Sequence, residues 1–291
     1  MSLLALMKSA KTAGEQPSIK HTVDMYYLKK SQETDQERYI DRLMRFQPSQ
    51  LSYNGSCPRA YHLVMRRDEY GISFIQEPKF SASMMRVFDH GHALHALYQD
   101  KVLGPAGVLY GEWQHQRTGE KIEGFMPQNE QSLWRYVEPR LIWPEMRITG
   151  YCDGIIFVNG QWCILEIKSA NNNSFMYVKS TGKPRDYHVR QAQIYVFAPK
   201  PTLSQQMHIS GVLMLYINKD TGEEAEFYVP RDEGIMGAIA NNIQQSIAAA
   251  NSPNLPPRLS DCKSERSTRA KDCHACGACF SLPNGSNDEL F

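Results

Sequence analysis

Long apolar runs are missing from this chain of 291 residues. No stretch approaches the roughly 20 consecutive apolar residues that a membrane-spanning helix needs, so we expect no membrane contact. The opening segment, MSLLALMKSAKTAGEQ, has too short an apolar run for a secretory signal peptide. We therefore expect a cytoplasmic protein, in which cysteines more often bind metal or do chemistry than form disulfides.

An excess of one charge is missing too. The 32 Lys and Arg residues nearly balance 31 Asp and Glu residues, so any contact with an anionic polymer must come from a local patch. The chain has no internal repeat, no low-complexity segment and no G-x-x-x-x-G-K-[ST] motif, which excludes a helicase motor of its own. With 42% hydrophobic and 22% charged residues, the composition is that of a folded globular protein.

The hydrophobic periodicity changes along the chain, and each change predicts a new element. Helical spacing gives way to strand-like runs after residue 146, and helices that flank a central, partly antiparallel sheet indicate an α/β fold. We expect helices at 33–46, 83–99, 186–198 and 232–250, and strands at 147–158, 161–168, 208–218 and 223–229.

The pair Asn159-Gly160 predicts a hairpin with a two-residue turn. The register set by this turn places Asp153 directly opposite Glu166, with their Cβ atoms roughly 5 Å apart. Side chains alternate along a strand, so Lys168 lies on the same face as Glu166. Like charges placed opposite each other destabilise a sheet unless a positive charge lies between them. Two carboxylates and one ammonium therefore converge on a mostly apolar hairpin.

This convergence suits hydrolysis of a phosphodiester with a divalent cation. Two carboxylates can hold Mg²⁺ or Mn²⁺ while positions stay open for water and a phosphate oxygen. A lysine can orient or activate the water, or neutralise charge that builds on phosphorus. The alternative is a structural ion pair between Lys168 and one acid on a solvated strand face. The neighbours Ile164, Leu165 and Ile167 disfavour that alternative, because they indicate a buried strand.

The hairpin resembles the core motif of the PD-(D/E)XK nuclease superfamily. The matching residues are Gly150-Tyr-Cys-Asp153, then twelve intervening residues, then Glu166-Ile-Lys168. The proline of that motif is absent, and Cys152 stands in its place.

Two further motifs resemble the RecB-like exonuclease branch of that superfamily. Upstream, Gly91 and His95 match a G-x-x-x-H helix whose histidine binds metal in the family. Downstream, Gln191 and Tyr195 match a Q-x-x-x-Y helix that lies beside the DNA in the family. Each motif alone is weak, and a lone histidine on a helix is more often an ordinary residue than a ligand. The order of all the motifs is specific, and the resemblance covers roughly residues 50–280.

The resemblance implies a restriction-endonuclease-like core in a metal-dependent deoxyribonuclease. This would be an exonuclease of phage or CRISPR-associated DNA processing, recombination or repair. It implies that Mg²⁺ or Mn²⁺ is bound by His95, Asp153, Glu166 and the backbone carbonyl of Ile167, that Lys168 assists the chemistry, and that Gln191 and Tyr195 position the strand. The nucleic-acid partner would be single-stranded DNA or duplex ends, and the chain would either act alone or rely on a separate motor or recombination protein. The alternative is a nuclease-like module that holds DNA or a protein without cutting.

A basic segment connects the hairpin to the Q-x-x-x-Y helix. It interleaves aromatic residues with basic ones and contains a single acid, Asp186. Basic residues grip phosphates and aromatic rings stack on bases, which is how single strands are held without sequence preference. The alternative is a solvated loop. The candidate DNA contacts are Lys179, Lys183, Arg185 and Arg190.

Cysteines crowd the C-terminal tail, where Cys262, Cys273, Cys276 and Cys279 could form a Cys₄ zinc site. The RecB-like resemblance implies a [4Fe–4S] cluster instead, held by one early cysteine and three late ones. The segment NGSCPRAY resembles the early site and makes Cys57 the candidate.

The family's C-x-x-C pair is incomplete here, because position 270 is Ala270. Cys262 would replace the missing ligand, which gives Cys57, Cys262, Cys273 and Cys279 as the cluster ligands and Cys276 as the alternative. The expected organisation is one nuclease domain over 1–291. It has an N-terminal helical extension at 1–50, the core at 51–250 and a cysteine-rich tail at 251–291 that closes the cluster site.

Overall fold

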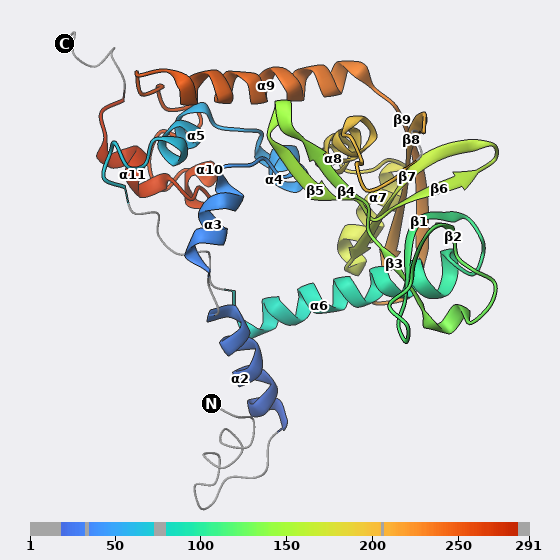
Figure 1. Cartoon of the computed structure of the whole chain (residues 1–291). Helices are drawn as coiled ribbons and strands as arrows, with labels where there is room; N and C mark the ends of the chain where they lie inside the picture. Colours follow the sequence, from blue (N-terminus) through green and yellow to red (C-terminus); the bar gives the residue numbers. More distant parts are fainter. Residues whose placement is uncertain (1–18, 33–34, 73–79, 205–206, 285–291) are drawn as a thin grey trace, which may run out of the picture.

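A seven-stranded mixed sheet forms the centre of the computed structural model, which describes residues 19–32, 35–72, 80–204 and 207–284 (Figure 1). Strands β7 and β8 are parallel, and the β1–β2, β1–β3, β1–β6, β6–β7 and β8–β9 pairs are antiparallel. Helices flank this sheet, so the predicted α/β class is confirmed. The order is β2 (Lys121–Phe125), β1 (Leu109–His115), β6 (Gly154–Val158), β7 (Gln161–Ala170), β8 (Ile209–Asn218) and β9 (Glu224–Pro230), with β3 (Trp134–Val137) also on β1.

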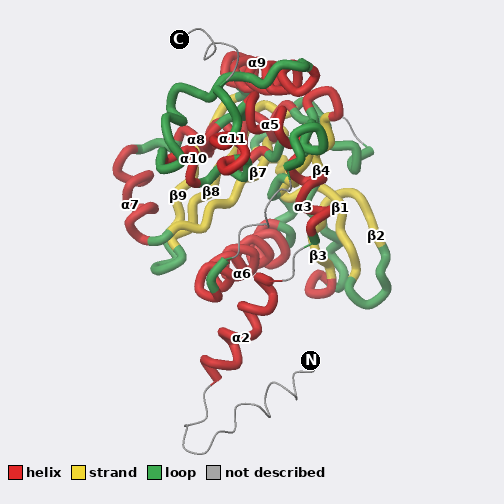
Figure 2. The backbone as a smooth tube through the Cα atoms, turned by 90° about the vertical axis from the view of Figure 1, so that its left-hand side faces the viewer, coloured by secondary structure: helices red, strands yellow, loops and turns green. Residues whose placement is uncertain are grey.

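Helices cover both faces of the sheet. The crossover from β7 to β8 consists of α7 (Asn172–Thr181) and α8 (Asp186–Phe197), whose apolar residues pack on Ile164 and Met214. On the other face, α6 (Ala82–Leu97) and the π-helical turn that continues it to Leu103 pack on Leu165 and Ile167. Figure 2 shows α6 below the strands and α9 (Glu233–Asn251) above them.

The N-terminal helices and the tail pack together beyond the sheet. Here α3 (Gln36–Leu43) and α5 (Pro58–Met65) share an apolar cluster with α11 (Cys276–Ser281), and α10 (Thr268–Lys271) lies just before it in the chain. Helix α4 (Pro48–Asn54) packs with α5 and α9 in a second apolar cluster. Helix α2 (Ile19–Gln32) contacts α6 through an ion pair of 3.2 Å between Lys30 and Asp89.

The predicted hairpin is present with its predicted register. Val158 pairs with Gln161 and Gly154 pairs with Leu165, and Asn159 and Gly160 adopt φ angles of 51° and 77° as a tight two-residue turn requires.

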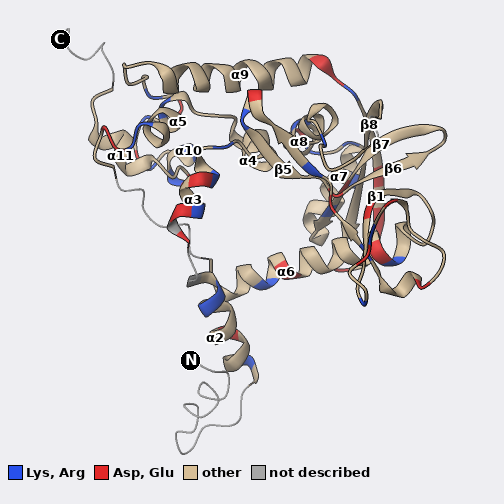
Figure 3. Cartoon of the chain, in the orientation of Figure 1, with Lys and Arg blue, Asp and Glu red and all other residues tan. Residues whose placement is uncertain are grey.

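The single strand expected at 147–158 is wrong. It is broken after residue 151, and its first half, β5 (Ile148–Tyr151), pairs with β4 (Arg140–Trp143) in a separate two-stranded sheet. Strands β1 to β4 were not anticipated. Among the described residues, no helix is long and apolar enough to cross a membrane. Acidic and basic residues are interspersed in the view of Figure 3.

Candidate functional site

Asp153 occupies the break between β5 and β6, where the backbone leaves the ladder. Its Oδ2 atom accepts a hydrogen bond of 2.6 Å from the amide of Ile167 on β7. The carboxylate thus replaces the strand partner that this amide would otherwise have. The next residue is Gly154, where an added Cβ would lie 2.6 Å from Leu109, so a side chain there would push β6 away from the core.

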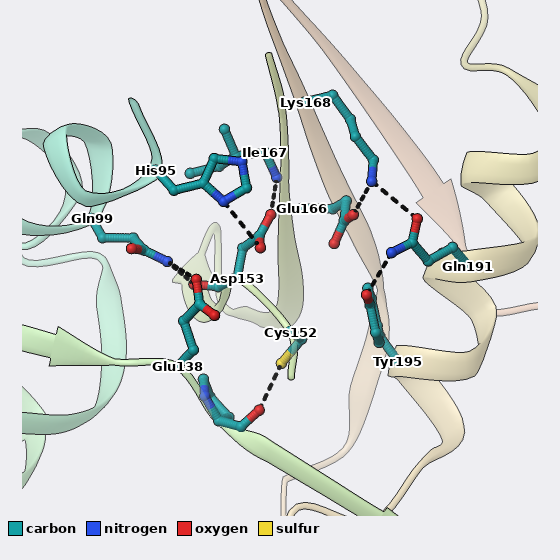
Figure 4. A network of polar contacts seen from close by, with 11 residues as sticks. His95, Gln99, Glu138, Cys152, Asp153, Glu166, Ile167, Lys168, Gln191 and Tyr195 are labelled. Atoms are coloured by element: carbon teal, nitrogen blue, oxygen red, sulfur yellow. Dashed lines mark hydrogen bonds and ion pairs between the residues drawn. The ribbon is translucent and has the colours of Figure 1, made fainter. Parts of the chain in front are cut away.

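Glu166 and Lys168 lie side by side on β7, as alternation along the strand predicts. The Lys168 ammonium is 2.5 Å from Glu166 Oε1 and donates to Gln191 Oε1 at 3.0 Å (Figure 4). Gln191 in turn donates to the Tyr195 hydroxyl at 2.6 Å. Glu166 is only 2% exposed, and within the described part of the chain its Oε2 atom has no hydrogen-bond partner. A buried carboxylate oxygen without a donor indicates a missing cation or water.

Burial makes ionisation of this acid costly. Burial raises the pKa of Glu166 to about 7, and Asp153 adds to the rise while Lys168 opposes it. For Lys168, burial lowers the pKa, but the negative charges of Glu166 and Asp153 outweigh that effect and leave the pKa raised. The network therefore keeps Lys168 positively charged beside the carboxylates of Glu166 and Asp153, which repel each other.

His95 and Glu138 complete a cluster of possible metal ligands around Asp153. His95 Nδ1 lies 3.3 Å from Asp153 Oδ1, and one donor atom from each of His95, Glu138 and Asp153 lies within 4.8 Å of the others. Gln99 joins them, because its amide donates to Glu138 Oε1 at 3.1 Å and to the Asp153 carbonyl at 2.7 Å. Gln99 belongs to the π-helical turn after α6, a feature often found at functional sites.

The pKa values of Glu138 and His95 reflect this crowding. Burial raises the pKa of Glu138, and the nearby Asp153 raises it further. Burial lowers the pKa of His95, but the hydrogen bond to Asp153 and the negative charges of Asp153, Glu138 and Glu166 together outweigh burial and leave it raised. Glu138 was not among the predicted residues. It lies between β3 and β4, outside every recognisable motif, so no spacing in the sequence connects it to the hairpin.

The predicted DNA contacts occupy different environments. Gln191 and Tyr195 are buried, and Gln191 accepts a hydrogen bond from Lys168 while it donates one to Tyr195, so Tyr195 supports the lysine through Gln191. Arg190 donates to the Ser52 carbonyl at 2.8 Å and thereby ties α8 to α4. The other three candidates lie on α7 or just after it: Lys179 pairs with Glu223, Arg185 stacks over Tyr177 at 4.4 Å, and Lys183 is exposed.

The five candidate cysteine ligands line one cavity of about 20 Å³, together with the buried Ala270. The thiols differ in their neighbours. Burial raises the pKa of Cys262, with Asp261 and Cys57 adding to the rise, whereas Glu265 and Cys279 are the neighbours that add to the effect of burial on Cys276. All five cysteines are described, and no three of their sulfurs lie within 4.8 Å of one another.

Comparison with known proteins gives likenesses of fold only. No family model and no curated protein sequence matches the chain. Among solved structures, SSO0001 is 18% identical with a TM-score of 0.40, over 91% of this chain and 98% of its own. An alkaline exonuclease from Laribacter hongkongensis is 14% identical with a TM-score of 0.42, over 75% of this chain and 93% of its own. Its complex with dAMP is 14% identical with a TM-score of 0.40, over 74% and 92%.

Proposed function

We propose that this chain is a divalent-metal-dependent DNA exonuclease that hydrolyses phosphodiester bonds. The observation that carries the proposal is the convergence of Asp153, Glu166 and Lys168 with His95 and Glu138 around β7, an internal strand of the sheet. Structural ion pairs satisfy their own charges, whereas this cluster leaves a buried oxygen of Glu166 without a donor. A cation supplies what that oxygen lacks.

The donor set fits a hard divalent ion. Asp153, Glu138 and His95 would hold it on the α6 side, and Glu166 and the Ile167 carbonyl would hold it on the β7 side. Carboxylates and a backbone carbonyl suit Mg²⁺ and Mn²⁺. When bound, the ion would polarise the phosphate and lower the pKa of an attacking water.

The chain itself contributes positioning and charge. The Ile167 amide fixes the orientation of Asp153, and Gln191 holds the Lys168 ammonium beside Glu166. From that position Lys168 would stabilise negative charge that develops on phosphorus, because its own charge is retained at neutral pH. Lys183 and Arg185, near the C-terminal end of α7, would contact the strand's phosphates. The order of the motifs supports a role in phage or CRISPR-associated DNA processing beside a separate motor or recombination protein.

Digestion of end-labelled DNA tests the proposal. Single-stranded and duplex substrates are incubated with Mn²⁺, with Mg²⁺ and with EDTA, using the wild type and Glu166→Gln. Cleavage that starts at ends, needs the metal and disappears in Glu166→Gln is the expected result. Glu226→Gln is the matched control, because Glu226 is exposed on the edge strand β9. DNA binding without any cleavage would instead make the chain a non-cutting module.

We further propose that the cysteine cavity holds a [4Fe–4S] cluster, with zinc as the alternative. Cysteine thiolates are the usual ligands of both. The resemblance of NGSCPRAY to the early cysteine site of the family favours the iron–sulfur centre over zinc. The cavity of about 20 Å³ is small for four irons, so loading requires the sulfurs to move outward.

Position 270 allows a test of the ligand set. Ala270 is 2% exposed and lines the cavity, so a cysteine there would restore the C-x-x-C pair with Cys273. Cys262→Ser should lose iron and visible colour in protein purified without oxygen, and adding Ala270→Cys should restore both. Cys276→Ser is the control and should keep its metal. If Cys276→Ser loses its metal instead, Cys276 replaces Cys262 in the set, and colourless protein with one zinc per chain overturns the iron–sulfur assignment.

A further inference from the structure

Arg59 is a buried guanidinium that touches the cysteine cavity. It follows Cys57 and Pro58 in the first turn of α5, and it is 1% exposed. Its Nε donates to the sulfur of Cys279 at 3.2 Å. Its remaining nitrogens donate to backbone carbonyls at 2.7 to 3.3 Å, those of Pro256, Cys279, Leu282 and Pro283.

None of these partners carries a charge. Among the described residues, no Asp or Glu carboxylate forms an ion pair with Arg59, although each nitrogen of its guanidinium donates at least one hydrogen bond. Arginine stays protonated inside proteins, so it cannot escape the cost of burial by losing its charge. A buried charge that is not paired is strongly destabilising. The position of Arg59 therefore calls for an anion within its reach.

The cysteine cavity is where that anion can form. A centre of four thiolates around a core of two positive charges carries a net negative charge, whether the core is zinc or an iron–sulfur cubane. Arg59 lines the same cavity as Cys57, Cys262 and Cys273 and already points a donor at Cys279. Arg258 reinforces the positive field, since it also lines the cavity and donates to the Cys279 carbonyl at 3.2 Å.

We propose that Arg59 is the counter-charge of a metal–thiolate centre and donates an N–H···S hydrogen bond to its ligand Cys279. This inference rests on the proposed cysteine centre. It makes Arg59 a positioning residue with two tasks. Its Nε stabilises the ligand sulfur, and its other donors hold the chain at Pro256 and Pro283, so the charge of the centre fixes both ends of the tail against α5.

A simpler role is a clamp on the tail through carbonyl contacts alone. Such a clamp would change thermal stability when removed, but it would not act on the metal. A counter-charge instead changes the retention and the redox equilibrium of the centre, because hydrogen bonds and charges near the ligand sulfurs tune both. These two readouts separate the roles.

The experiment compares the wild type, Arg59→Gln, Arg59→Lys and Arg66→Gln, all purified without oxygen. Arg66 is the matched control, since it lies at the end of α5, pairs with Glu69 and donates to the Ser252 carbonyl. We expect Arg59→Gln to release its metal to a chelator at least 10-fold faster, in the range seen when outer partners of metal ligands are removed. Arg66→Gln should release it at the wild-type rate.

If the centre contains iron, its reduction should become less favourable in Arg59→Gln, because reduction adds a negative charge beside the lost positive one. A tenfold change in this one-electron equilibrium corresponds to about 59 mV. Arg59→Lys keeps the charge without the planar fork and should lie between the wild type and Arg59→Gln. It also supplies the comparison if Arg59→Gln does not fold.

Two results would count against the inference, and they differ. Metal-loaded protein in which the Arg59 variants match Arg66→Gln in release rate and potential overturns the role of Arg59 and leaves the cysteine centre standing. Wild-type protein that binds neither iron nor zinc overturns the cysteine centre, and the counter-charge role falls with it.

Discussion

Replacing Glu166 by Gln should stabilise the metal-free protein at alkaline pH while it abolishes cleavage. Glu166 is 2% exposed and lies beside Asp153 in the site network. In the folded chain, burial raises the pKa of Glu166 from its ordinary value of 4.5 to about 7. Because the folded carboxyl holds its proton more tightly, the contribution of Glu166 to stability is highest below pH 4.5 and is lost as the pH rises through about 7.

The size of the effect follows from the two pKa values. The pKa of Glu166 rises from 4.5 to about 7, and each pKa unit corresponds to about 1.4 kcal/mol. Above pH 7 this rise lowers the free energy of unfolding by about 3 kcal/mol. Glutamine resembles the protonated carboxyl and carries no such cost. The attraction of Lys168 is already included, since it opposes the rise in pKa. Glu166→Gln should therefore exceed the wild type by about 3 kcal/mol at pH 8, and the gap should close towards pH 4.5.

Urea unfolding in EDTA, at a series of pH values, measures this difference. The exposed Glu226→Gln is the control and should follow the wild type at every pH. Adding Mn²⁺ should then stabilise the wild type more than Glu166→Gln, because a ligand that binds only the folded state stabilises it by an amount that grows with the logarithm of its affinity. A Glu166→Gln protein that is no more stable than the wild type at pH 8 would refute the reasoning.

Three further substitutions separate binding of the ion from chemistry. Glu138→Gln and His95→Ala should each raise the Mn²⁺ concentration needed for half-maximal cleavage by about 10-fold or more, with partial recovery at high Mn²⁺. Unchanged metal dependence in titrations of either variant would remove that residue from the site. Lys168→Met should bind Mn²⁺ as the wild type does, measured by calorimetry, yet cleave at a small fraction of its rate. Full activity in Lys168→Met would show that the ammonium is only structural.

The hairpin was predictable because short-range physics determines it. Asn159 and Gly160 both adopt positive φ, which few other residue pairs tolerate, and the period of two along β7 then aligns the charges. The sequence did not reveal that Asp153 leaves the ladder. The residue after it, Gly154, packs against Leu109, a contact across the sheet that no local pattern announces.

Glu138 and the strands before β5 escaped prediction for a related reason. Along β1 the buried positions include Gly111 and His115 as well as Leu109 and Trp113, so the apolar alternation that reveals a half-buried strand is interrupted. Glu138 depends on these strands for its position, because it follows β3. A candidate ligand carried by an unrecognised element cannot be placed from sequence.

The tail shows a different case, in which the spacing of the cysteines predicts a site but not its surroundings. Four cysteines near the C-terminus and Cys57 line one cavity. The role of Arg59 could not be foreseen, because an arginine after a proline reads as an ordinary residue of a first helical turn. Only its burial, with carbonyls and a sulfur as partners, makes its charge conspicuous.

Each of the two sites contains a charged group that the folded chain leaves uncompensated, negative at one site and positive at the other. Around the internal strand β7 the folded chain brings carboxylates together and leaves an oxygen of Glu166 unsatisfied, which a cation would correct. In the tail it buries the Arg59 guanidinium among neutral partners, which an anionic metal–thiolate centre would correct. Sequences that fold well are locally consistent, and departures concentrate where function requires them. Each uncompensated charge therefore indicates both where an ion belongs and what its net sign must be.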